Sequence, residues 1–87
     1  MEWSTKVELA KALNNGENEK ACDIVLNNEM DIQAWDMFLV GMDLSKTEDY
    51  RPLLNKIKES KSEISQHLKL REVLRMNTLI DRLEQNN

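Results

Sequence analysis

The stretch "IQAWDMFLVGM", residues 32–42, carries only two polar side chains, Gln33 and Asp36. At about 100° per residue, its largest apolar side chains share one helical stripe; they are Ile32, Trp35, Phe38, Leu39 and Met42. Met37 and Val40 fall on the opposite flank, so little of the helix surface is polar. We therefore expect a central helix that water reaches mainly along Asp36 and Asp43.

The aromatic and methionine side chains of this helix support two interpretations. Trp35, Phe38 and Met37 could line a groove for a peptide, because aromatic rings and flexible thioethers adapt to apolar ligands. Stripes of this kind more often pack in a core. We expect core packing for the stripe and keep Met37, with Asp36 and Asp43, as a second candidate binding surface.

Two helices are expected before this central helix. The first has Ser4 as a candidate N-cap and ends at "NNG", where Gly16 can adopt the left-handed conformation. Its apolar residues recur at helical spacing: Val7, Ala10 and Leu13. The second, "ENEKACDIVLNN" (residues 17–28), begins with acidic residues, which the helix dipole favours. A short loop between the two predicts antiparallel packing.

Beyond the central helix, a proline indicates where the next helix begins. Asp49 is the preferred N-cap, because it places Pro52 in the first turn, where a missing N–H group costs little. Apolar residues then follow on one side: Leu53, Leu54 and Ile57. Ser60 and Glu63 have the spacing of a capping box. They leave open whether residues 50–84 form one helix or two.

The composition narrows the fold class. Two glycines and one proline in 87 residues argue against a turn-rich β protein. Cys22 is the single cysteine, which excludes an internal disulfide and with it a small secreted scaffold held together by disulfides. We expect an all-α fold: a small bundle of four to five helices with a long C-terminal helix, in one domain over residues 1–87.

The sequence also predicts a location. No apolar run approaches the roughly 20 residues that a membrane-spanning helix needs. The N-terminal residues show neither a basic leader nor an apolar core for export. We expect a cytoplasmic protein that does not contact membranes.

Side chains suited to catalysis or metal binding are sparse. The chain has one histidine and one cysteine, and it lacks a Gly-rich phosphate loop, an HExxH motif and any zinc-ligand spacing. Cys22 has apolar neighbours and should be buried, whereas His67 has polar neighbours and should lie at the surface. We therefore expect no catalytic or metal-binding residue, no cofactor and no small-molecule substrate, in a protein that is not an enzyme.

The C-terminal stretch "LREVLRMNTLIDRL", residues 70–83, has more apolar residues than one helix face can hold. One arc of about 140° is broad enough to pack on a core; it comprises Leu68, Val73, Met76, Leu79, Ile80 and Leu83. Leu70 and Leu74 project to another side. Between the two sets lie three arginines: Arg71, Arg75 and Arg82. Either the preceding helix covers Leu70 and Leu74, which is the interpretation we prefer, or these leucines are exposed for a partner.

An exposed leucine pair with arginines at its rim is typical of a protein interface. Residues 1–50 carry eleven acidic and four basic residues, a net charge of −7, and residues 51–87 carry eight basic and five acidic, a net charge of +3. Either the two halves attract each other within one fold, or the second half binds an acidic partner, one candidate being a second copy of this chain.

The sequence therefore predicts a non-catalytic interaction module, such as an adaptor, chaperone or inhibitor. It would bind a protein partner through the C-terminal helix and the flank of the central helix. The predicted partner-binding residues are Leu70, Arg71, Leu74, Arg75, Arg82, Asp36, Met37 and Asp43.

A small DNA-binding regulator is the alternative. The phrases "SEISQHLKL" (62–70) and "NTLIDRLE" (77–84) resemble the DNA-reading end of MarR-type winged helix-turn-helix proteins. The resemblance implies DNA recognition, but the intervening "REVLRM" (71–76) favours continuous helix over a turn, so no contact residue is transferred. The cations available to phosphates would be Lys69, Arg71, Arg75 and Arg82. The acidic first half disfavours nucleic acid as a partner.

Overall fold

The computed structural model describes the backbone of residues 1–85 and the side chains of residues 1–46 and 51–85. The α-helices are α1 (Trp3–Asn14), α2 (Asn18–Asn27), α3 (Ile32–Gly41), α4 (Leu54–Ile64) and α5 (Leu70–Gln85). Two 3-10 helices join them: η1 (Leu44–Leu53) and η2 (Ser65–His67). The expected all-α bundle with a long C-terminal helix is confirmed.

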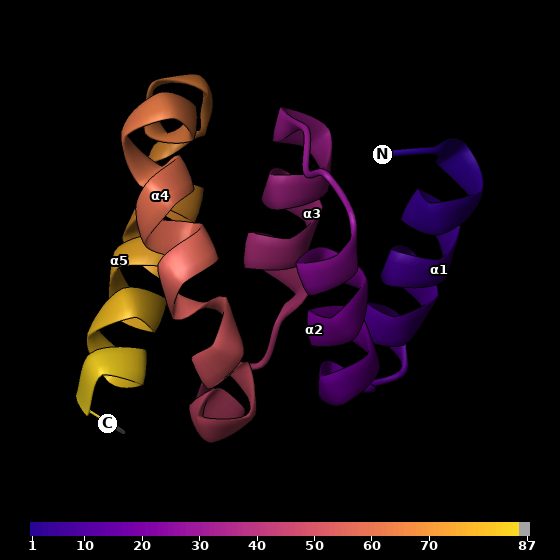
Figure 1. The fold of residues 1–87 in the computed structure, drawn as a ribbon, viewed down its shortest axis with the longest axis horizontal. Helices are drawn as coiled ribbons and strands as arrows, with labels where there is room; N and C mark the ends of the chain where they lie inside the picture. The colour runs from indigo at the N-terminus through magenta and orange to yellow at the C-terminus, as the bar shows by residue number, and fades with distance from the viewer. Residues whose placement is uncertain (86–87) are drawn as a thin grey trace.

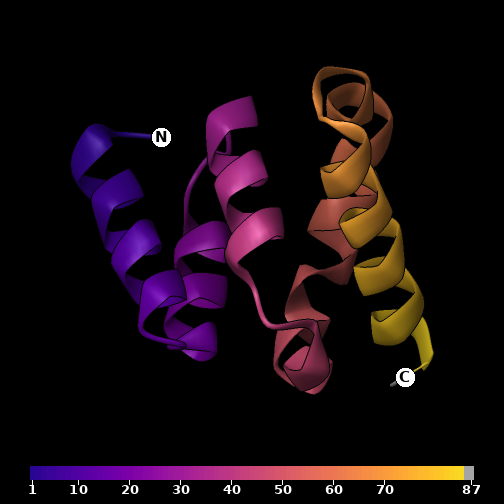
Figure 2. The same cartoon turned by 180° about the vertical axis from the view of Figure 1, so that it is seen from behind.

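The helices alternate in direction along the chain (Figure 1). α1 and α2 form one antiparallel pair and α4 and α5 another, with α3 between the two pairs (Figures 1 and 2). Trp35, Phe38 and Leu39 of α3 are at most 1% exposed. The rings of Trp35 and Phe38 meet edge to face, with centroids 6.3 Å apart. The prediction of a central, apolar helix is thus confirmed. Water reaches it mainly at Gln33 and Val40, which are exposed, whereas Asp36 is half-buried, so the predicted wetting along Asp36 and Asp43 is wrong.

One hydrophobic core draws side chains from every α-helix. Its buried members are Leu9, Ala12, Ala21, Cys22, Val25, Trp35, Phe38, Leu39, Met42, Leu53, Leu54, Ile57, Ile64, Met76, Leu79, Ile80 and Leu83. The buried arc predicted for the C-terminal helix is largely confirmed, although Val73 is only half-buried, and Leu68, also half-buried, precedes α5. Within residues 1–85 the structure contains no helix with the length and apolarity needed to cross a membrane.

The predictions for the ends of the first helices are confirmed only in part. Gly16 has a φ of 71°, the left-handed conformation predicted for it. Ser4 lies inside α1, which begins at Trp3 without a side-chain cap, so the predicted N-cap is wrong. Asp31 caps α3 by accepting a hydrogen bond from the Ala34 amide at 2.8 Å.

The segment after α3 departs from the expected pattern. Asp43 caps η1 by accepting hydrogen bonds from the Ser45 amide at 2.9 Å and the Ser45 hydroxyl at 2.6 Å. Pro52 lies inside this 3-10 helix, and α4 begins only at Leu54. The predicted cap, Asp49, lies outside the described side chains. Two separate helices, α4 and α5, answer the question that the capping-box spacing left open.

Candidate protein-interaction surface

Leu70 and Leu74, which we call the leucine strip, lie one turn apart on α5 and are 73% and 56% exposed. The preferred interpretation, that α4 covers them, is wrong. α5 has a single buried arc, which faces both α3 and α4; it comprises Glu72, Met76, Leu79, Ile80 and Leu83. The leucine strip lies on the other side of the helix, so neither neighbouring helix reaches it.

Arg71 is the arginine of α5 that borders the leucine strip. It follows Leu70 directly and is three residues before Leu74, so its side chain neighbours that of Leu74 on the helix surface. The Arg71 side chain is 67% exposed, and one guanidinium nitrogen lies 3.2 Å from Oε1 of Glu72. An apolar pair with a solvent-accessible guanidinium at its rim is thus present on the folded protein.

Arg75 and Arg82 are engaged within the fold. The Arg75 guanidinium donates hydrogen bonds to the carbonyls of Leu39 and Met42, the latter at 2.6 Å, and so caps the C-terminal end of α3. Arg82 is exposed and donates to the Leu44 carbonyl at 3.1 Å. Their predicted role in partner binding stays a prediction, and both arginines tie α5 to the end of α3.

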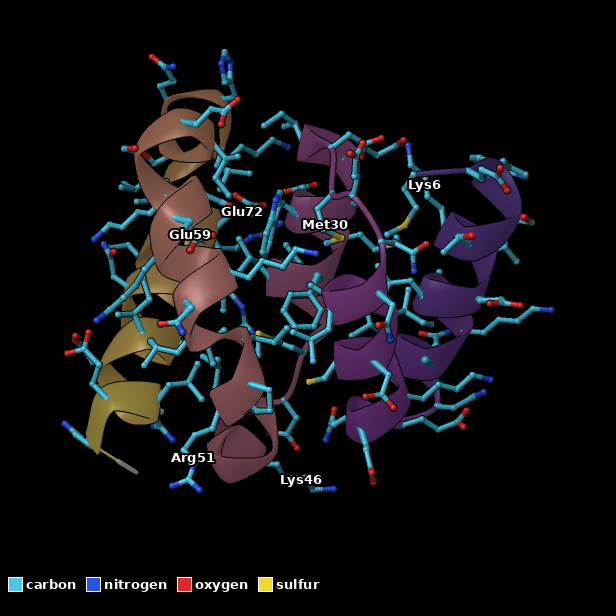
Figure 3. The ribbon with its side chains drawn as sticks, in the orientation of Figure 1. Lys6, Met30, Lys46, Arg51, Glu59 and Glu72 are labelled. Carbon is cyan, nitrogen blue, oxygen red and sulfur yellow. The ribbon has the colours of Figure 1, made fainter. Side chains whose placement is uncertain are left out.

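Glu72 is a site that the sequence did not single out. It is fully buried on α5, in the region between the α4–α5 pair and α3 (Figure 3). Its Oε2 atom has no amide or hydroxyl donor among the described residues. The Asp36 carboxyl of α3 interacts with that of Glu72. This contact, together with burial and the charge of Glu72, raises the pKa of Asp36.

Asp43 is exposed and acts as a helix cap. The hydrogen bonds from the Ser45 hydroxyl and amide lower its pKa below the usual value. Asp43 therefore already has partners within η1, and it does not line the concave surface described next. Its role in partner binding stays a prediction.

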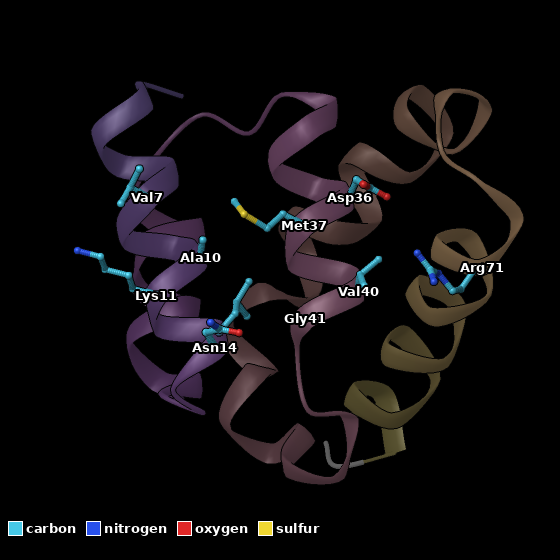
Figure 4. Close-up of a pocket in the computed structure, with 10 residues that line it drawn as sticks. Val7, Ala10, Lys11, Asn14, Asp36, Met37, Val40, Gly41 and Arg71 are labelled. Atoms are coloured by element: carbon cyan, nitrogen blue, oxygen red, sulfur yellow. The ribbon is translucent and has the colours of Figure 1, made fainter.

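A concave surface of about 530 Å³ lies between α1 and α3 and extends to α5. We call it the α1–α3 groove (Figure 4). Its lining residues are Val7, Ala10, Lys11, Leu13, Asn14, Asp36, Met37, Val40, Gly41 and Arg71. In Figure 4 Met37 points toward α1, whereas Asp36 and Val40 point toward α5. α3 thus forms the floor of the groove, with α1 on one side and α5 on the other.

The wall from α1 is a second apolar stripe that the core does not use. α1 buries Leu9 and Ala12, whereas Val7 is only half-buried and Ala10 is exposed. Trp3, one turn before Val7, is 74% exposed and lines an adjoining hollow of about 150 Å³. The signal was present in the sequence, because two sets of apolar residues at helical spacing cannot both face one core.

The groove agrees with only part of the expected peptide site. Met37 lies in it, as does Asp36, whereas Trp35 and Phe38 are buried in the core. The core packing expected for these two rings is thus confirmed, and the alternative that they line a groove is wrong. Arg71 connects the two candidate surfaces, because it lines the groove and also borders the leucine strip. The α1–α3 groove and the leucine strip are therefore adjacent.

Groups suited to chemistry are not gathered at this surface. Cys22 is 3% exposed in the core and His67 is exposed in η2, as predicted for each. Within residues 1–85, no three His, Cys, Asp or Glu side chains are close enough together to hold a metal ion. What the surface offers is apolar area, the accessible guanidinium of Arg71 and the carboxyl of Asp36.

Comparison with known proteins returned no matching family model, curated protein or solved structure. The geometry of the described residues therefore carries the functional argument.

Proposed function

We propose that this chain is a non-catalytic protein–protein interaction module that binds a partner protein through the leucine strip and Arg71. The exposure of Leu70 and Leu74 on a well-packed helix carries the proposal. Burying each of these side chains in a complex would contribute about 1.5–3 kcal/mol. Arg71 beside them can pair with a carboxylate at the rim, where arginine is enriched in interfaces.

The test compares the wild type with a double variant, Leu70→Asp and Leu74→Asp. Asn55→Asp with Ser62→Asp is the matched control, because both of these residues are exposed on α4 and the change in charge is the same. Each tagged protein is incubated with extract of its native source, and retained proteins are quantified by mass spectrometry. We expect the leucine variant to lose a specific partner that the wild type and the control retain.

Circular dichroism of the same samples separates binding from folding. Because both leucines are exposed, the double variant should keep its helicity and its unfolding midpoint. The proposal fails if the leucine variant remains folded and retains the same proteins as the control. Unfolding of the variant would also count against it, because the leucines would then act in the core.

DNA binding through the arginine stripe draws less support from the geometry. The guanidinium groups of Arg75 and Arg82 already donate to backbone carbonyls, so fewer of their N–H groups are available to phosphates. A salt titration with random duplex DNA tests this alternative, because counterion release makes such binding fall steeply with salt. Absence of binding at low salt would eliminate it.

We propose the cytoplasm as the compartment in which this protein acts. Cys22, the single cysteine, is buried in the core and needs no oxidising environment for the fold. Fractionation of the native source with an antibody to the chain would test the location.

A further inference from the structure

We infer that the partner is a second copy of this chain, in a two-fold symmetric dimer in which each leucine strip fills the α1–α3 groove of the other copy. The inference rests on the proposed function, because it names the occupant of the same surface. It adds the groove as the receiving site and a reciprocal geometry as the way in which the two copies meet.

The two surfaces have complementary shapes. The leucine strip is a convex apolar ridge, since Leu70 and Leu74 project from a helix and are 73% and 56% exposed. The α1–α3 groove is concave, and Val7, Met37 and Val40 supply apolar lining. No described side chain of the chain itself fills the groove or covers the ridge. The ridge of one copy can therefore fill the groove of the other.

The leucine strip and the α1–α3 groove are adjacent, which allows two copies to form a closed dimer. Arg71 lines the groove and neighbours Leu74, so a two-fold axis close to Arg71 would place each strip opposite the other groove. Both contacts then form in one complex, and the assembly closes instead of growing into a filament. A standard interface covers about 800 Å² on each partner, a modest share of the 5269 Å² surface of the chain.

The charges at the axis are also complementary. Asp36 and Arg71 lie on opposite sides of the same groove, on α3 and α5, and both side chains face it (Figure 4). A two-fold rotation can bring Arg71 of each copy to Asp36 of the other, which makes two identical ion pairs. Residues 1–50 carry a net charge of −7 and residues 51–87 a net charge of +3. These charges also favour the dimer, because the basic half of each copy approaches the acidic half of the other.

Sedimentation equilibrium of the pure protein, from about 1 µM to about 1 mM, tests self-association. We expect the average mass to rise from that of one chain to that of two. Leu74→Asp in the strip and Val40→Asp in the groove should each weaken the dimer at least about tenfold. Asn55→Asp on α4 is the control and should leave it unchanged.

Mixing the two weakened variants tests the reciprocal geometry. A heterodimer of Leu74→Asp with Val40→Asp keeps one intact strip in one intact groove, so the mixture should associate more tightly than either variant alone. A monomeric wild type at every concentration would overturn the inference. So would a dimer that Val40→Asp leaves intact, or a mixture no tighter than its components.

A charge exchange provides a second, independent test. Asp36→Arg and Arg71→Asp each place like charges at both proposed ion pairs of their own dimer, so each alone should weaken association. Mixed together, the two variants restore both pairs, and the heterodimer should form preferentially. Circular dichroism before mixing establishes that each variant is folded. Failure to form the heterodimer from folded variants contradicts the ion pairs, and with them the placement of the axis.

These results separate the inference from the proposed function. A monomeric wild type that still loses a native partner on replacement of Leu70 and Leu74 would overturn the dimer and leave the interaction module standing. A monomeric wild type that loses no partner on this replacement would contradict both.

Discussion

Glu72 shows how one buried carboxyl can be accommodated in a small core. The residue is fully buried, and its neighbour Arg71 is mostly exposed, so the ion pair between them is partly screened by water. Asp36 brings a second carboxyl to the same place, and its pKa is raised by hydrogen bonding with Glu72, by burial and by the charge of Glu72. Two ionised carboxylates at this place repel each other, so a proton on Asp36 relieves the repulsion.

Replacement of Asp36 by asparagine should stabilise the protein at about pH 7 by about 1 kcal/mol. The raised pKa means that folded Asp36 binds its proton more tightly than the unfolded chain, whose value is 3.8. Its contribution to stability is therefore present at low pH and is lost as pH rises through the folded pKa. Asparagine is neutral at every pH and its amide can donate a hydrogen bond to Glu72, so its advantage should vanish near about pH 3, where Asp36 is also protonated.

Urea unfolding at several pH values measures this difference. Asp81→Asn is a suitable control, because Asp81 is an exposed residue of the same helix as Glu72. A difference between Asp36→Asn and the wild type that stays constant with pH would contradict the raised pKa of Asp36.

The position of Glu72 was predictable, but its partner was not. On the helical wheel residue 72 falls inside the arc of Met76, Leu79 and Leu83, which marks it as buried. The carboxyl that meets it comes from α3, and the mutual orientation of α3 and α5 is a tertiary property. A helical wheel contains no information on that orientation.

Among the helices, α3 depends on a neighbour at one of its ends. Its first turn is capped locally by Asp31, but its last carbonyls receive hydrogen bonds from Arg75 of α5. A similar contact occurs at the end of α2, where Lys56 of α4 donates to the carbonyls of Val25 and Asn28, the latter at 2.7 Å. Basic side chains from the second half thus satisfy the helix ends of the first half.

Arg75→Ala should lower the free energy of unfolding by about 1.5–3 kcal/mol, because two buried carbonyls lose a charged donor. Arg82→Ala removes one bond at an exposed position and should cost less than about 0.5 kcal/mol. Thermal and urea unfolding of the two variants gives the comparison. Equal effects would show that the cap of α3 contributes no more than a surface contact.

The sequence predicted the helices better than the segment between α3 and α4. Apolar periodicity placed α3 correctly, since this signal is local. Residues 43–53 carry competing local signals, and the structure uses Asp43 as the cap and places Pro52 in η1. Which of several caps is used depends on where the chain must rejoin the core, and that is not a local property.

At the scale of the whole molecule, the excess of basic residues in the second half supplies donors to helix ends in the first half. The two halves do attract each other, but the contacts run from Lys56, Arg75 and Arg82 to backbone carbonyls of the first half. A sequence supplies counts of charged side chains, but it does not show that helix ends would be their partners. The exposure of Leu70 and Leu74 and the shape of the groove were likewise beyond its reach, because both depend on how the helices pack.

Cys22 provides a probe of the cooperativity of the molecule. Its side chain is 3% exposed within the core, so a thiol reagent reaches it only when the core opens. We expect labelling of the native protein to be at least about 1,000-fold slower than in urea, because opening a core costs close to the global stability. Mass spectrometry of timed maleimide reactions gives the rates. Labelling of the native protein at the denatured rate would show that α2 opens independently of the rest.

The cap that Arg75 places on α3 also has a consequence for the order of folding. Arg75 is separated by 36 residues from Leu39 and by 33 from Met42, so these bonds join distant parts of the chain. During synthesis the central helix emerges well before α5 does, and its last turn must wait in water for its donor. The hydrogen bonding at the end of α3 is therefore completed only after α5 has been made, which makes the arrival of α5 a late step in the folding of the central helix.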